Sequence, residues 1–213
     1  MKTFYIDTSS SYLYTGIVSN NNILGCIKKE FGKDLSKDTL VEVEKLFNNL
    51  NLKPNDIDKI IVVSGPGSFT GIRIGMTIAK IYAWALKKEI ITITSLEAMA
   101  ASLETKELKV PLIDARRGFV YAGVYDHEEL VLENQYIKLI DLENYLKSLN
   151  KDYFYITNQT NLNISNIKEY DPDILKIVDK YKDKPSINPH LVEPTYFKLT
   201  EAEENLGNIS YDN

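Results

Sequence analysis

Residues 65–86 read GPGSFTGIRIGMTIAKIYAWAL, and this stretch decides the fold. A short apolar strand at residues 60–63 comes before it, and the stretch itself is a glycine-rich turn followed by a strongly apolar helix over residues 71–86. The uninterrupted Ile-Ile-Val-Val of the strand favours a central position in a sheet that is covered on both faces. A strand, a turn and a helix in this order predict a crossover of an α/β protein.

The turn before the helix has two interpretations. Gly65 and Gly67 permit backbone conformations closed to other residues, and Ser68 or Thr70 can cap the first helical turn. The free amides of that turn, together with the helix dipole, can instead hold an anion. The glycine spacing matches neither the dinucleotide fingerprint nor a P-loop, so an ordinary connection and a phosphate-binding turn both stay open. The candidate anion or nucleotide contacts are Asp7, Gly65, Gly67, Ser68, Thr70 and Arg116.

The helix over residues 71–86 is apolar around most of its circumference, which one buried face does not explain. Arg73 and Lys80 inside a run shorter than the roughly 20 residues of a membrane span exclude a transmembrane helix. Either its own domain covers the helix, or one row of side chains packs on the sheet and another meets a partner. The two apolar rows are a small one, Gly71, Gly75, Ala79 and Ala83, and a bulky one, Ile74, Ile78, Ile81 and Ala85.

The composition is that of an ordinary folded protein. The 213 residues, 44% of them hydrophobic and 26% charged, suffice for one large domain or two small ones. We expect no signal peptide or membrane anchor, and the single Cys26 fits a reducing compartment, so we expect a cytoplasmic protein. A formal charge of −5 does not provide the basic field of a protein that holds nucleic acid by itself.

The first half predicts the element order βββαβαβα, with Ser36 as the cap of its first helix. A charged, unpatterned stretch then places a domain boundary near Glu104. The second half predicts βββαβα, with Asp141 capping one helix and Pro172 opening another. We therefore expect lobes at residues 1–104 and 105–213, with the tail from about residue 195 packing back on the first. The strands are expected at residues 2–7, 12–18, 23–30, 59–64, 90–94, 110–114, 119–125, 130–140 and 153–156, and the helices at 36–50, 71–86, from 95, 141–149 and 172–181.

Two successive βββαβα halves resemble the two-lobed actin, hexokinase and Hsp70 superfamily, whose lobes are ribonuclease H-like and usually bind a nucleotide between them. Local sequences resemble the bacterial TsaB family, also called YeaZ. The matching stretches are IDTSS at residues 6–10, GPGSFTGIRIG at 65–75, TSLEAMA at 94–100, DARRGFVYAGVYD at 114–126 and PTYFK at 194–198.

This resemblance implies a subunit of the machinery that places threonylcarbamoyl on the adenosine beside the anticodon of tRNA. It implies pairing with TsaD, a catalytic partner of similar fold, through the first two helices of the N-terminal lobe. It also implies a third subunit, the ATPase TsaE, self-pairing in the absence of the partner, ATP or ADP at the interface of the complex, and contact with tRNA through the complex alone. The predicted partner contacts are Leu40, Val43, Phe47, Gly71, Ile72, Gly75, Met76, Ala79 and Ala83.

The catalytic groups of TsaD-like enzymes have no match in this sequence. Those enzymes hold a metal through an HxxxH helix motif plus an aspartate, whereas His127 and His190 are far apart here. We therefore expect no metal, no cofactor of its own and no catalytic residue. Asp7 is either a turn cap or a contact to metal-bound nucleotide, and Arg116 either binds an anion or lies exposed in a turn. The open alternatives to an assembly subunit are an ATPase, a phosphotransferase, a peptidase-like enzyme or a homodimeric regulator.

Overall fold

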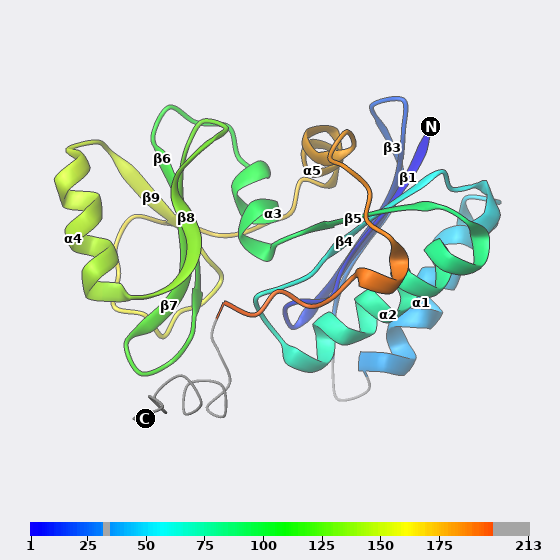
Figure 1. Cartoon of the computed structure of the whole chain (residues 1–213), viewed down its shortest axis with the longest axis horizontal. Coiled ribbons are helices and arrows are strands. Elements are labelled where there is room, and N and C mark those ends of the chain that lie inside the picture. The colour runs from blue at the N-terminus through cyan, green and yellow to red at the C-terminus, as the bar shows by residue number, and fades with distance from the viewer. Residues whose placement is uncertain (32–34, 198–213) are drawn as a thin grey trace, which may run out of the picture.

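In the computed structural model, which describes residues 1–31 and 35–197, the chain forms two five-stranded sheets that lie side by side (Figure 1). The first sheet has the strand order β3-β2-β1-β4-β5. Its first three strands form an antiparallel meander, and β1, β4 and β5 run parallel. The strands are β1 (Lys2–Asp7), β2 (Tyr12–Ser19), β3 (Asn22–Glu30), β4 (Lys59–Val63) and β5 (Glu89–Ile93).

The second sheet repeats this arrangement in the order β10-β9-β6-β7-β8, with a meander followed by parallel strands. The chain therefore has the duplicated, two-lobed actin- and hexokinase-like fold that the element order predicts. One difference is that residues 157–166 connect β9 to β10 without a helix. The strands are β6 (Leu108–Asp114), β7 (Phe119–Asp126), β8 (Glu129–Lys138), β9 (Tyr153–Ile156) and β10 (Ile167–Lys168).

Two helices cross between the halves. Leu96 and Met99 of α3 pack against Phe154 of the second sheet, whereas Ile177 of α5 packs against Tyr5 of the first. Strands β1 to β5 form one sheet and β6 to β10 form the other, but one helix of each half packs against the sheet of the other half. The division of the chain into residues 1–104 and 105–213 therefore stays a proposal. The helices are α1 (Leu35–Asn49), α2 (Phe69–Leu86), α3 (Ser95–Ala101), α4 (Leu139–Leu149) and α5 (Ile174–Tyr181), with short 3₁₀ turns η1 (Pro54–Asp56) and η2 (Pro189–Leu191).

Four predicted helix starts differ from the structure by one or two residues. Helix α2 begins at Phe69, two residues before the predicted Gly71. Helix α1 begins at Leu35, so Ser36 lies inside its first turn. Helix α4 begins at Leu139, directly after Lys138. The carboxylate of Asp141 lies in the first turn, where its negative charge interacts favourably with the helix dipole, but it is not the cap. Helix α5 is capped by Asp173, whose side chain accepts a hydrogen bond from the Lys176 amide. Of these helices, α5 alone has a side-chain cap from a residue other than the predicted one, and α4 begins at Leu139 with no side-chain cap from Lys138.

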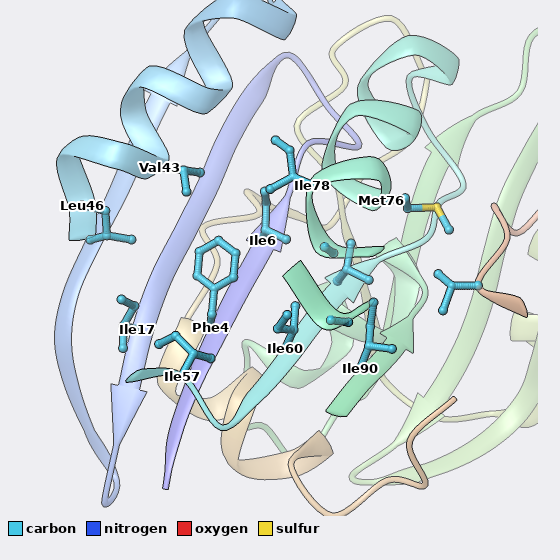
Figure 2. Packing of buried hydrophobic residues seen from close by; sticks show 14 of the residues in the cluster. Phe4, Ile6, Ile17, Val43, Leu46, Ile57, Ile60, Met76, Ile78 and Ile90 are labelled. Carbon is cyan, nitrogen blue, oxygen red and sulfur yellow. The ribbon is translucent and has the colours of Figure 1, made fainter. Parts of the chain in front are cut away.

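The core of the first lobe lies between its sheet and the pair α1 and α2 (Figure 2). Side chains alternate along β4: Ile60 faces this core, whereas Ile61 faces the opposite side, which α5 covers. The predicted burial of this strand on both faces is thus confirmed. Within residues 1–31 and 35–197, no helix is both long and apolar enough to span a membrane.

The segment after η2 runs from the first lobe toward the second (Figure 1). The Thr195 amide donates a 2.8 Å hydrogen bond to the carbonyl of Ser64 at the end of β4. Two residues later the ring of Phe197 lies 6.3 Å from that of Tyr121 in β7. The described part of the predicted tail therefore contacts both lobes, and the rest of it, residues 198–213, lies outside the described residues.

Candidate functional site

The small row of α2 faces its own lobe. The Thr8 hydroxyl, at the end of β1, donates a 2.7 Å hydrogen bond to the Gly71 carbonyl and accepts one of 3.1 Å from the Gly75 amide. A Cβ atom at Gly71 would lie 2.0 Å from the Thr8 carbonyl oxygen, and one at Gly75 would lie 2.4 Å from the Thr8 hydroxyl oxygen. The small residues therefore let β1 approach α2, and no partner helix fits there.

The other predicted partner contacts are also corrected by this packing. Leu40 alone of the predicted set is exposed, at 53%. A side chain that already packs in the core of its own lobe is not available to a partner. The predicted contacts that lie in this core are Val43, Phe47, Ile72, Met76, Ala79 and Ala83.

A different set of apolar side chains is exposed on these helices. Ile81 and Trp84 of α2 are 54% and 63% exposed, and Leu40 and Val41 of α1 and Phe69 at the start of α2 are exposed as well. We call these five residues the outer face. Neither Phe69 nor Trp84 is among the predicted partner contacts, although their spacing, four residues from Arg73 for Phe69 and seven from Thr77 for Trp84, places them on the same side of the helix as those polar residues and was a usable signal.

The Thr8 contact predicts a measurable loss of stability on substitution. Thr8→Val keeps the shape of this buried side chain but removes both hydrogen bonds to α2. We expect the free energy of unfolding to fall by about 1–3 kcal/mol, because the Gly75 amide loses its hydroxyl acceptor in a buried place. Urea unfolding measures this, and Thr70→Val, an exposed site on the same helix, should change little. Equal effects of the two substitutions would contradict the role given to Thr8.

A cleft of about 860 Å³ lies between the lobes. Of the candidate anion contacts, Asp7, Gly67 and Ser68 line it, and Gly65, Thr70 and Arg116 are not among its lining residues. From the second lobe, Asp114 at the end of β6 lies in the position equivalent to that of Asp7 at the end of β1.

Carboxylates dominate the charge of this cleft. The ammonium of Lys28 forms a 2.6 Å ion pair with Asp171, so it is already neutralised. This charge balance disfavours a bare phosphate. In the described parts of the chain, no group of three or more His, Cys, Asp or Glu side chains is placed to hold a metal ion. The charged residues that line the cleft are Asp7, Lys28, Glu30, Asp114, Glu169 and Asp171.

The glycine-rich turn is held by the chain itself. The Ser68 amide donates a 2.6 Å hydrogen bond to the Ser9 carbonyl, and the Ser68 hydroxyl accepts one from the Gly71 amide, which confirms Ser68 as the helix cap. The Ser95 hydroxyl donates to the carbonyl of Pro66. The Ser68 and Gly71 amides and the Ser95 hydroxyl are donors that a phosphate site would need free, so these bonds favour the ordinary connection.

Asp7 is a buried carboxylate that closes a turn. Its Oδ1 accepts a 2.8 Å hydrogen bond from the Ser9 amide, and the residue is 2% exposed. Burial raises the pKa of the Asp7 carboxyl above its ordinary value of 3.8, and hydrogen bonding from Ser9 opposes part of that rise. The ionised form is therefore less stable here than in the unfolded chain.

The raised pKa of Asp7 gives a pH-dependent prediction. A pKa raised on folding means that protonation stabilises the folded state at low pH and that this gain is lost as the pH rises through the folded pKa. Asp7→Asn keeps the acceptor for Ser9 without the charge. We expect the variant to be more stable than the parent chain at pH 7 and to lose this advantage below pH 3.8. Urea unfolding across this pH range tests it, and a destabilised variant at pH 7 would contradict the assignment.

Arg116 lies away from the cleft lining, in the turn between β6 and β7. Its backbone has a φ of +67°, its amide donates a 2.8 Å hydrogen bond to Oδ1 of Asp114, and its side chain is exposed. The two histidines lie in unrelated places, His127 after β7 and His190 in η2 beside Trp84. The structure thus brings together only part of the predicted anion contacts.

The chain is similar in sequence to proteins of threonylcarbamoyladenosine biosynthesis. The family model TsaD, described as tRNA N6-adenosine threonylcarbamoyltransferase, matches residues 14–171. The chain is 31% identical to the Bacillus subtilis protein named tRNA threonylcarbamoyladenosine biosynthesis protein TsaB, covering 95% of this chain and 96% of that protein. A Haemophilus influenzae protein of the same name is 37% identical over 40% of this chain and 38% of its own length.

Solved structures support the fold. Two chains from Pseudomonas aeruginosa, YeaZ and an uncharacterized protein with similarity to peptidase YEAZ, superpose with TM-scores of 0.73 and 0.77. Each covers 92% of this chain and 99% of its own length, at 19% and 18% identity. Given the matched family model and the TsaB protein aligned along nearly the whole sequence, the chain belongs to the TsaB (YeaZ) family.

Proposed function

We propose that this chain is a non-catalytic assembly subunit of the machinery that makes threonylcarbamoyladenosine in tRNA. In this proposal it binds and activates a TsaD-like threonylcarbamoyltransferase through the outer face of α1 and α2. The observation that carries the proposal is the exposure of Leu40, Val41, Phe69, Ile81 and Trp84 on two neighbouring helices. The pathway itself comes from the names of the relatives.

The residue types of the outer face support a protein partner. Exposed apolar side chains gathered on one surface mark interaction sites more often than isolated ones do. Aromatic residues and arginine are enriched where protein interfaces have their strongest contacts, and the guanidinium of Arg73 lies 3.7 Å from the centre of the Phe69 ring. Trp84 and Ile81 can then lose water on binding, which is the main source of affinity in such a contact.

The nature of the partner follows from the family match. A TsaD model matches residues 14–171, which include both α1 and α2, so a TsaD-like chain presents a related pair of helices. We therefore expect the helix pair α1 and α2 of this chain to lie against the corresponding pair of the partner.

Light scattering tests the proposal. Mixing the purified chain with its TsaD-like relative is expected to give a particle with the summed mass of one copy of each. No mass increase at micromolar concentration would contradict the proposal. The same surface also permits self-pairing, so the chain alone should dimerise when no partner is present, and adding the partner should replace that dimer.

An enzyme remains the alternative class, because Asp7 and Asp114 line an interlobe cleft. Calorimetry with Mg-ATP on the isolated chain separates the two classes: tight binding lost in Asp7→Ala would favour an ATPase or phosphotransferase. In our proposal ATP or ADP is held at an interface of the complex. A TsaE-like ATPase is a third subunit of that complex, and tRNA binds to the complex as a whole. The proposed location is the cytoplasm.

A further inference from the structure

The turn between β6 and β7 holds two arginines in an unfavourable backbone conformation. Arg116, Arg117 and Gly118 have φ values of +67°, +56° and +78°. The Ala115 amide donates a 2.9 Å hydrogen bond to the Phe119 carbonyl, and the Phe119 amide donates one of 3.0 Å to the Arg116 carbonyl; these two bonds close the turn. Asn or Gly is the usual residue at left-handed positions, because a Cβ atom is crowded there. Both arginine side chains are exposed, so the turn presents two guanidinium groups to solvent at a cost to its backbone.

A third cation and an aromatic pair lie beside this turn. Lys138 is the direct cross-strand partner of Phe119, and its ammonium lies 5.9 Å from the centre of the Phe119 ring. The Phe119 ring stacks on that of Tyr136 at a centroid distance of 4.6 Å and an interplanar angle of 5°. We call Arg116, Arg117 and Lys138 the basic cluster. Phe119, partly exposed, forms an apolar surface next to it.

The charges of the basic cluster are not neutralised. Among the residues that the structure describes, none of its three side chains forms an ion pair. The neighbouring carboxylate of Asp114 is used otherwise, since it accepts hydrogen bonds from the Arg116 amide and the Asn161 side chain. Most other lysines of the second half are paired with carboxylates, namely Lys151, Lys168, Lys176, Lys180, Lys182 and Lys184.

We propose that the basic cluster binds the phosphates of tRNA, with a base or ribose of the RNA resting against Phe119. Arginine guanidinium groups bind phosphate in bidentate fashion, and aromatic side chains beside a basic surface are typical of proteins that hold unpaired RNA. The cluster belongs to the second sheet, whereas the outer face lies on the helices of the first, so the two surfaces belong to different lobes (Figure 1). The choice of tRNA rests on the proposed function.

The negative overall charge limits how strongly the basic cluster can bind RNA. At a formal charge of −5 the chain repels RNA at long range, so the basic cluster adds a local contact within the complex and does not hold tRNA by itself. The test therefore uses the complex of the full chain with its TsaD-like partner and a fluorescently labelled tRNA transcript. Fluorescence anisotropy gives the dissociation constant at several salt concentrations.

The double substitution R116Q/R117Q removes two cations and keeps polar side chains. We expect tRNA binding about 10-fold weaker at moderate salt, and a logarithmic salt slope reduced by roughly 1.5 because two phosphate contacts are lost. K138Q, which lies outside the strained turn, should also weaken tRNA binding. The matched control K106Q/K147Q removes two exposed lysines of the same half that form no ion pair with any described residue, and it should change neither the affinity nor the salt slope by as much.

Each other outcome overturns the proposal. Equal losses in R116Q/R117Q and K106Q/K147Q would indicate a general charge effect, and loss of the protein complex in R116Q/R117Q would assign the cluster to a protein partner. If light scattering shows that the parent chain forms the complex but the complex does not bind tRNA, the RNA contact is rejected and the assembly role stands. If light scattering shows no complex, the assembly role fails, and the RNA contact, which rests on that role, fails with it.

Discussion

Ile81→Glu is expected to abolish binding of the TsaD-like partner while the chain stays folded. Ile81 belongs to the outer face and is 54% exposed, so glutamate meets water in the free chain. In the complex the same carboxylate would be buried against apolar side chains, where an unpaired charge is costly. We expect the affinity to fall by more than about 100-fold, which corresponds to roughly 2.7 kcal/mol or more. Calorimetric titration of the partner measures it.

Ile140 provides a matched control. It is 55% exposed on α4 of the second lobe, so Ile140→Glu makes the same chemical change on a surface of the same exposure. This variant should bind the partner with the affinity of the parent chain, and both variants should keep the parent's midpoint of thermal unfolding. An unchanged affinity of Ile81→Glu, or an equal loss in both variants, would contradict the assignment of the outer face.

Gly71→Val is expected to unfold the first lobe or nearly so. A Cβ atom at this position would lie 2.0 Å from the Thr8 carbonyl oxygen, and that oxygen belongs to backbone that cannot move without breaking β1 away from α2. Overpacking of a close-packed contact costs about 1–3 kcal/mol and occasionally more, and we expect at least about 3 kcal/mol here because backbone meets backbone. Urea unfolding gives the change in free energy.

Thr77→Val serves as the comparison for Gly71→Val. Thr77 is exposed on the same helix, so the substitution introduces the same β-branched side chain without steric conflict, and stability should change by no more than about 0.5 kcal/mol. A Gly71→Val chain that folds with the parent's stability and yet fails to bind the partner would show that the small row, and not the outer face, meets the partner.

Local patterns predicted most of the fold. The apolar run at residues 60–63, the glycine-rich turn and the cap at Ser68 are confirmed because each depends on residues close in the sequence. The direction of the α2 rows depends on Thr8, which is 63 residues away from Gly71, and helical periodicity carries no such information. The packing of α5 on the first sheet was missed for the same reason, since an amphipathic helix does not name its sheet.

The candidate anion contacts show the same limit. Asp7, Gly67 and Ser68 reach one cleft because the end of β1 and the start of α2 are hydrogen-bonded to each other. Arg116 does not join them, because its turn extends beyond the end of β6, where Asp114 lines the cleft instead. The acidic character of the cleft arises from residues of both lobes, and no single stretch of sequence displays it.

The central claim, that the outer face binds a TsaD-like partner, is tested most directly at Trp84. It is the only tryptophan of the chain and is 63% exposed, so 5-fluorotryptophan labelling gives a single ¹⁹F resonance from within the proposed interface. On adding unlabelled partner, the resonance should shift and lose its dependence on the exchange of H₂O for D₂O. A complex of full mass that leaves the Trp84 resonance and its solvent dependence unchanged would contradict the claim.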